Sequence, residues 1–216
     1  HRDRCEHDKL RSRAGMDRGG TLTKAMADSD PSPRPGSDLP FDRIPGGVDA
    51  TLRDGRVAHL RPIRASDEAE VLQAFERFSP EARYMRFMRV VKAPNLERLR
   101  RTLAAFPQGG DAIIATVPAV DGIDIVGSAT YIILDDTSRC EFAISVAASF
   151  GGAGLGRLLM QAIIDAARQR GLKEMVGFVL AINQPMLGLA RRMGFSIAPD
   201  PEDPSVRLCR LSLQGA

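Results

Sequence analysis

Four glycines lie within six residues, at Gly151, Gly152, Gly154 and Gly156, and a leucine-rich segment of helical spacing follows them directly. The first N–H groups of a helix have no partner inside the helix and carry a partial positive charge. Glycines before such a helix let a ligand reach the backbone without meeting Cβ atoms. The pattern therefore predicts an anion site, with phosphate as the expected ligand. The alternative is a tight strand-to-helix turn without a ligand, which needs fewer glycines.

The spacing of the glycines argues against two other phosphate-binding motifs. A nucleoside triphosphate loop requires GxxxxGK[ST], but Arg157 and Leu158 follow Gly156 here, so the lysine and the hydroxyl are missing. The dinucleotide fingerprint requires glycines at offsets zero, two and five in an opening strand–helix–strand unit. Arg157 takes the place of its last glycine, and the motif comes late in the chain. The spacing that fits is GxxGxG, starting at Gly151.

The elements that position these glycines follow from the periodicity of the apolar residues. Alternation or a continuous apolar run predicts strands over 57–63, 111–117, 125–134, 140–147, 174–181 and 206–213. Caps and helical spacing predict helices that start near Ser66, Ser79, Pro94, Leu155 and Pro185. This order predicts an α/β (α+β) domain, in which a central mixed sheet is flanked by helices.

Composition divides the chain into two parts. Residues 1–47 mix charges with the stretch DSDPSPRPGSDLP and end in IPGG, a composition that buries too little apolar surface to offset its ordering entropy. We expect a flexible, disordered leader over 1–47 and a single folded domain over 48–216.

The composition also excludes several classes of function. Three scattered cysteines without a CxxC pair, and a single histidine, His59, beyond the leader, predict no metal site, no disulfide framework and a reducing, cytoplasmic compartment. The chain has no run of 18 apolar residues, which argues against a membrane span. Nucleic-acid binding is disfavoured because the net charge is only +3 and no aromatic stacking platform accompanies the arginines.

At the GxxGxG spacing the sequence resembles the GNAT superfamily of acyl-CoA-dependent N-acetyltransferases, whose main motif is Q/R-x-x-G-x-G/A between a strand and a helix. The stretch NQPMLGLARRMGF, which starts at Asn183, is similar to the family's helix that begins with Asn and ends in Gly-Phe. The resemblance covers about Leu52 to Leu213. It implies that acetyl-CoA is the cosubstrate, and that its pyrophosphate lies on the loop formed by Gly151, Gly152, Ala153, Gly154, Leu155, Gly156 and Arg157. It also implies that the pantetheine arm pairs with the strand at Ile144, Val146 and Ala147 and contacts Asn183.

Glu141 is the candidate general base, because an amine must lose a proton before it attacks a thioester. Strand alternation places Glu141 on the less apolar face of 140–147, opposite Phe142. The stretches EFAISV and SPEARYMRFM most resemble the Pat-like protein lysine acetyltransferases, which implies a glutamate base here and a protein lysine as acceptor. A backbone N–H near Val146 would meet the oxyanion. The alternative for Glu141 is a surface ion pair with Arg139.

Three residues depart from the family's pattern. Gly151 stands where Gln or Arg is usual, Ala153 where a basic residue is frequent, and Ala190 where many members carry a tyrosine that acts as general acid. These departures keep two other functions open, a noncatalytic acyl-CoA-binding or regulatory module and a small-molecule amine acetyltransferase. Cys140 and Tyr131 are expected to be packing residues.

A cluster of basic residues lies earlier in the sequence than Glu141 and the glycines. Its members are Arg83, Arg86, Arg89, Lys92, Arg98, Arg100 and Arg101. A solvated helix face is the ordinary interpretation of such a cluster. The alternative is that it receives the 3′-phosphate of the coenzyme or an acidic partner surface.

Overall fold

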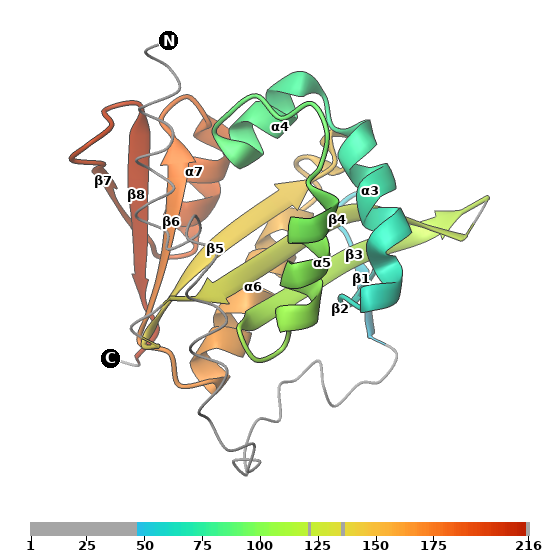
Figure 1. Cartoon of the computed structure of the whole chain (residues 1–216), viewed down its shortest axis with the longest axis horizontal. Coiled ribbons are helices and arrows are strands. Elements are labelled where there is room, and N and C mark those ends of the chain that lie inside the picture. The colour runs from blue at the N-terminus through green and yellow to red at the C-terminus, as the bar shows by residue number, and fades with distance from the viewer. Residues whose placement is uncertain (1–46, 121, 135–136, 215–216) are drawn as a thin grey trace.

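The computed structural model of the chain describes residues 47–120, 122–134 and 137–214. Within them the strands form one sheet of eight, in the order β1-β2-β3-β4-β5-β6-β8-β7. Neighbouring strands are antiparallel except β5 and β6, which are parallel. Helices cover both faces of this mixed sheet (Figure 1), which confirms the predicted fold class. The predicted leader, 1–47, lies outside the described residues apart from Gly47.

The elements have the following bounds. The strands are β1 (Val48–Thr51), β2 (Val57–Pro62), β3 (Gly110–Ala119), β4 (Gly122–Ile133), β5 (Arg139–Val146), β6 (Glu174–Leu180), β7 (Ser196–Pro199) and β8 (Val206–Ser212). The helices are α3 (Glu68–Arg77), α4 (Pro80–Phe87), α5 (Leu96–Ala105), α6 (Leu155–Gln169) and α7 (Gln184–Arg192), with short 3-10 turns at Ala65–Asp67 and Ala148–Phe150. All the predicted strands and helices are present, and β1 and β7 were not predicted.

Helix α6 fixes the position of the glycine loop against the sheet. It packs on β3, β4 and β5, and in Figure 1 it lies behind the sheet, with α3 and α5 in front. Its predicted apolar stripe is buried except at Leu158, which is 38% exposed, and Leu155, Leu159 and Ile163 are fully inaccessible. Gly127 on β4 permits the close approach, since a Cβ there would lie 2.8 Å from Leu159 and 3.1 Å from Leu155. The first turn of α6 is therefore held directly on the sheet.

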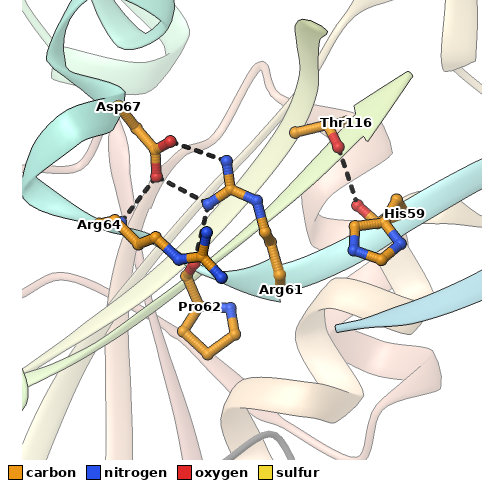
Figure 2. A network of polar contacts seen from close by, with 6 residues as sticks. All are labelled: His59, Arg61, Pro62, Arg64, Asp67 and Thr116. Carbon is orange, nitrogen blue, oxygen red and sulfur yellow. Dashed lines mark hydrogen bonds and ion pairs between the residues drawn. The ribbon is translucent and has the colours of Figure 1, made fainter. Parts of the chain in front are cut away.

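The start of α3 differs from the prediction that Ser66 caps this helix. A 3-10 turn comes first, and α3 begins at Glu68 with Asp67 as its N-cap residue. The Asp67 carboxylate accepts bonds from the Arg61 guanidinium at 2.7 and 2.8 Å and from the Arg64 backbone N–H at 2.7 Å (Figure 2). Burial by itself raises the pKa of Asp67, but these bonds outweigh it and lower the pKa. A buried ion pair, which the local pattern did not indicate, therefore sets this helix start.

Candidate active site

Strands β5 and β6 form a fork. Their pairing covers only Arg139 to Glu141 on β5 and Glu174 to Val176 on β6. Beyond these residues β5 continues to Val146 and β6 to Leu180, and Figure 1 shows the two strands running apart. Glu141 is the last paired residue of β5, so it lies where the strands separate. The edge of β5 that faces the fork can accept an extended ligand as an additional strand.

The backbone of β5 shows which N–H groups face the fork. The N–H of Ala147 donates to the carbonyl oxygen of Val126 at 2.8 Å, toward β4. Because successive residues of a strand point their N–H groups to opposite edges, the N–H groups of Val146 and Ile144 point toward the fork. Two of the three strand residues predicted to meet the coenzyme thus lie on its open edge, while the Ala147 amide is used within the sheet.

The glycine loop presents bare amides at the start of α6. Gly154 is the N-cap residue, and the helix has no side-chain cap. Gly152 and Gly154 adopt left-handed conformations, with φ of 76° and 92°, which favour glycine. The N–H groups of Gly152, Gly154, Leu155 and Gly156 have no acceptor among the residues the structure describes. Leu155 is fully buried, so the accessible amides belong to the three glycines.

The other predicted loop residues donate their amides within the chain. The N–H of Gly151 bonds to Ala148 at 3.0 Å, that of Ala153 to Phe150 at 3.4 Å, and that of Arg157 to Gly154 at 3.1 Å. Ala153 is also buried, at 5% exposure. The amides of these three residues stabilise the loop. Fewer of its N–H groups are therefore available to a ligand than the sequence indicated.

Asn183 lies at the start of α7, beside the fork. Its Oδ1 accepts a bond from the Met186 N–H at 3.2 Å, so the side chain caps the helix. Asn183 also lines the cleft described below. A Cβ at Gly156 would contact both Leu189 of α7 and Val146 of β5, at 3.4 and 3.6 Å. The start of α6, the Leu189 region of α7 and the end of β5 therefore meet at one place.

A cleft of about 1820 Å³ connects the glycine loop, the fork and Glu141. Seven arginines and two carboxylates line it: Arg53, Arg77, Arg86, Arg89, Arg98, Arg157, Arg192, Asp124 and Glu141. Asp124 pairs with Arg77 at 2.6 Å. The remaining cations exceed the single carboxylate of Glu141, so the cleft favours anionic ligands.

Glu141 has an unusual electrostatic environment. Burial raises its pKa, and the nearby charges of Arg86 and Arg98 lower it, with a resulting pKa of about 7. A carboxyl group with such a pKa is partly protonated at neutral pH and can exchange a proton with a ligand. Burial in turn lowers the pKa of Arg86, which the charge of Glu141 raises. The charges that act on Glu141 thus come from α4 and α5.

The basic cluster of the sequence divides into two groups. Arg83 donates to the carbonyl oxygens of Lys92 and Glu76 and lies over the Phe75 ring, and Arg100 pairs with Glu68 at 2.8 Å. These contacts hold α3, α4 and α5 together. Arg86 and Arg98 instead line the cleft and act on Glu141 through their charges. The three-residue spacing of Arg83, Arg86 and Arg89 indicated a basic helix face. It could not show which arginines hold the helices together and which act on Glu141.

Two side chains that could compete with Glu141 for a chemical role are packing residues, as predicted. Cys140 is fully buried and its pKa is raised to about 12 by burial, so it is no thiolate nucleophile. Tyr131 is also fully buried, and burial raises its pKa. Neither of the chain's two tyrosines lines the cleft, and Ala190 lies in the core.

The arrangement fits acetyl-CoA. Uncapped amides line the cleft at the start of α6, an open strand edge runs along it, arginines line it, and a titratable carboxyl lies where the strands part. These features match a phosphate group, an amide-containing arm and a reacting thioester. Among the described residues no cluster of His, Cys, Asp and Glu could hold a metal ion. No helix in this part of the chain is long and apolar enough to cross a membrane.

Comparison with known sequences agrees with this geometry. Residues 70–195 match the model of the acetyltransferase (GNAT) family. Acetyltransferase PA5475 of Pseudomonas aeruginosa is 31% identical over 163 residues, which cover 76% of this chain and 88% of that protein. An L-methionine sulfoximine/L-methionine sulfone acetyltransferase of the same species is 41% identical over 58 residues, 27% of this chain and 34% of that protein.

Solved structures share the fold. The GNAT domain of S. lividans PAT superposes with a TM-score of 0.68 at 21% identity, over 76% of this chain and 96% of that one. The acetyltransferase yncA of Salmonella typhimurium, solved with acetyl-CoA, has a TM-score of 0.56 at 18% identity, over 74% and 95%. The family model, the P. aeruginosa relative and the shared fold lead to one conclusion. The chain belongs to the acetyltransferase (GNAT) family and is an acyl-CoA-dependent N-acetyltransferase that uses acetyl-CoA as cosubstrate.

Proposed function

We propose that the protein transfers the acetyl group of acetyl-CoA to a primary amine by direct attack, with Glu141 as the general base. The observation that carries this proposal is the position of Glu141 at the fork between β5 and β6, combined with its pKa of about 7. A base with a pKa near the working pH combines a large deprotonated fraction with enough basicity to accept a proton.

The coenzyme lies along the fork in this proposal. The amides of Gly152, Gly154 and Gly156 receive its pyrophosphate, as the uncapped start of α6 favours. The pantetheine arm adds to the edge of β5 at Ile144 and Val146. The Nδ2 group of Asn183 is available to this arm, because only its Oδ1 is used in capping α7 among the described residues.

The chemical step follows from this placement. Glu141, directly or through a water molecule, takes a proton from the ammonium form of the acceptor, and the neutral amine then forms a bond to the thioester carbonyl carbon. The Val146 N–H, which points into the fork, stabilises the developing oxyanion, a kind of contact worth about 2.7–4 kcal/mol in other enzymes. The C–S bond breaks as the carbonyl reforms, and the amine nitrogen loses its second proton to water. The leaving thiolate needs no tyrosine, in agreement with Ala190 in the core.

A protein lysine is the acceptor that we propose first. The support is the similarity of EFAISV and SPEARYMRFM to the Pat-like protein lysine acetyltransferases. A small amine is the second candidate, because the relatives include acetyltransferases of L-methionine sulfoximine and L-methionine sulfone. Both reactions suit a reducing, cytoplasmic compartment, which the free buried thiols of Cys140 and Cys209 also favour.

An acceptor panel tests the proposal against a noncatalytic acyl-CoA-binding module. Release of free coenzyme A is followed with a thiol reagent in the presence of lysine peptides and of L-methionine sulfone, and products are identified by mass spectrometry. Turnover with any primary amine supports the enzyme, and the preferred acceptor distinguishes the two substrate classes. Binding of acetyl-CoA without turnover on any acceptor would favour the module.

A further inference from the structure

The turn between β1 and β2 is hydrogen-bonded to the segment that contains the glycine loop. Arg53 donates its backbone N–H to the carbonyl oxygen of Ala153 at 3.0 Å. Arg56 donates to the carbonyl oxygen of Ser149 at 2.8 Å, and its guanidinium lies 3.8 Å from the centre of the Phe150 ring. Residues about a hundred positions apart in the sequence are thus in direct contact, and the β1–β2 turn packs against one side of the glycine loop.

The Arg53 side chain lies over the loop at the point where α6 begins. A Cβ built on Gly154 would be 3.5 Å from Arg53 Nε, 3.6 Å from its Cγ and 3.7 Å from its Cδ. Arg53 also lines the cleft. Its guanidinium has no hydrogen bond or ion pair within residues 47–120, 122–134 and 137–214. Arg56, three positions later, is engaged with Asp54 and Ser149.

The glycine loop brings a single cation, Arg157, to a bound phosphate. From Ala148 to Gly156 the sequence ASFGGAGLG carries no charged side chain, and burial of Ala153 keeps that position away from a ligand. A pyrophosphate carries negative charge on both phosphate groups, so bare amides and one arginine leave part of this charge without a cation. A guanidinium is suited to this role, because it donates two parallel bonds to phosphate oxygens.

We propose that Arg53 is a coenzyme-binding residue, whose guanidinium pairs with the pyrophosphate of acetyl-CoA above Gly154. The proposal rests on acetyl-CoA lying along the glycine loop, as in the proposed function. It places a second positive charge, besides Arg157, on the turn between β1 and β2, an element far from the loop in the sequence.

Affinity measurements on Arg53→Ala test this role. We expect coenzyme A to bind about tenfold more weakly by calorimetry, since a charge-assisted bond to phosphate is lost. Arg53→Lys keeps the charge without the planar group and should lose less. Arg101→Ala is the matched control, because it removes the same charge from an exposed pair of α5 with Glu97. The difference between Arg53→Ala and the natural protein should shrink at high ionic strength.

Truncated ligands locate the contact. The penalty of Arg53→Ala should persist with dephospho-coenzyme A, which lacks the 3′-phosphate, and disappear with S-acetylpantetheine, which lacks all phosphates. A penalty lost with dephospho-coenzyme A would overturn the assignment to the pyrophosphate. Equal affinity of Arg53→Ala and the natural protein for coenzyme A would overturn the role itself. Failure of the natural protein to bind coenzyme A would instead refute the placement of the coenzyme on which the inference rests.

Discussion

At the scale of single residues, the proposed chemistry depends on the balance of charges around Glu141. Burial favours the neutral acid, and Arg86 and Arg98 favour the carboxylate. The resulting pKa of about 7 divides Glu141 between the two forms near neutral pH. A fully exposed glutamate would be a weaker base, and a buried one without these arginines would have a still higher pKa. In the proposed mechanism the helices α4 and α5 therefore act on the reaction through Glu141.

The dependence of activity on pH should report this balance. We expect kcat/KM to rise with pH through an apparent pKa of about 7, because only the Glu141 carboxylate accepts the proton, while the acceptor amine titrates separately near 10.4. Arg86→Gln removes a charge that lowers the pKa of Glu141, so this limb should move to higher pH. Arg100→Gln removes the same charge from the pair with Glu68 and should leave the limb in place. If the apparent pKa of kcat/KM were the same in Arg86→Gln as in the natural protein, a group other than Glu141 would be responsible for it.

Some of the site could be predicted at this scale and some could not. The glycines and Glu141 stand in short local patterns, and a strand's alternation already separates Glu141 from Phe142. Arg53 belongs to no pattern, because its importance comes from a contact with Gly154 about a hundred residues away. Arg86 was visible only as a member of a basic cluster, since no periodicity indicates which arginine turns toward a carboxylate.

At the scale of elements, the fork between β5 and β6 is the feature that makes room for the coenzyme in the proposed binding mode. Phe142 and Gly177 are the first residues beyond the last paired positions, Glu141 and Val176. A Cβ at Gly177 would collide with the Phe142 ring, and this ring also packs edge-on against Phe195 at 5.1 Å. The absence of a side chain at Gly177 therefore leaves space for an aromatic ring at the base of the fork.

Substitution at Gly177 tests this packing. Gly177→Ala should lower the free energy of unfolding by about 1–3 kcal/mol, because the added methyl group overpacks the site against Phe142. Gly188→Ala, in the middle of α7, is the control. Its Cβ meets only the movable end of Arg192, and alanine favours a helix, so its stability should be unchanged or slightly higher. Denaturant unfolding compares the two, and a Gly177→Ala protein as stable as the natural one would contradict the packing.

The elements were predicted well where the apolar pattern is long and poorly where it is short. Helix α6 spans fifteen residues with a continuous buried stripe, and its periodicity is unambiguous. Strands β1 and β7 have four residues each and are mostly exposed, so alternation has too few positions to appear. The cap of α3 was misassigned to Ser66 because Asp67 is held by Arg61, a partner on the preceding strand.

At the scale of the whole molecule, one ligand site joins segments from most of the chain. Residues of the β1–β2 turn, α4, α5, β5, the start of α6 and α7 all line the same cleft. The order of strands could be anticipated only through family resemblance, because the sequence does not show which strands are neighbours. The fork arises from that order, since β5 meets β6 only at its start.

A ligand that contacts so many elements should stabilise the whole domain. Acetyl-CoA at a hundred times its dissociation constant should contribute about 2.7 kcal/mol, which is roughly 5–10 °C in melting temperature for a domain of this size. Thermal unfolding measures the shift, with ATP and NAD as controls that carry adenine and phosphates but no pantetheine arm. A shift of similar size with ATP would mean that the pantetheine arm and the fork add little to the recognition.

The most direct test of the account is to measure turnover and acetyl-CoA binding together on Glu141→Gln. Glutamine keeps the shape of the side chain but cannot accept the proton, so kcat should fall about 10²–10⁴-fold, while the dissociation constant of acetyl-CoA stays nearly unchanged. Because the pKa of Glu141 is raised on folding, the variant should also be more stable than the natural protein above pH 7, which excludes misfolding as the cause. Turnover that survives in Glu141→Gln would contradict the assignment of Glu141 as the base.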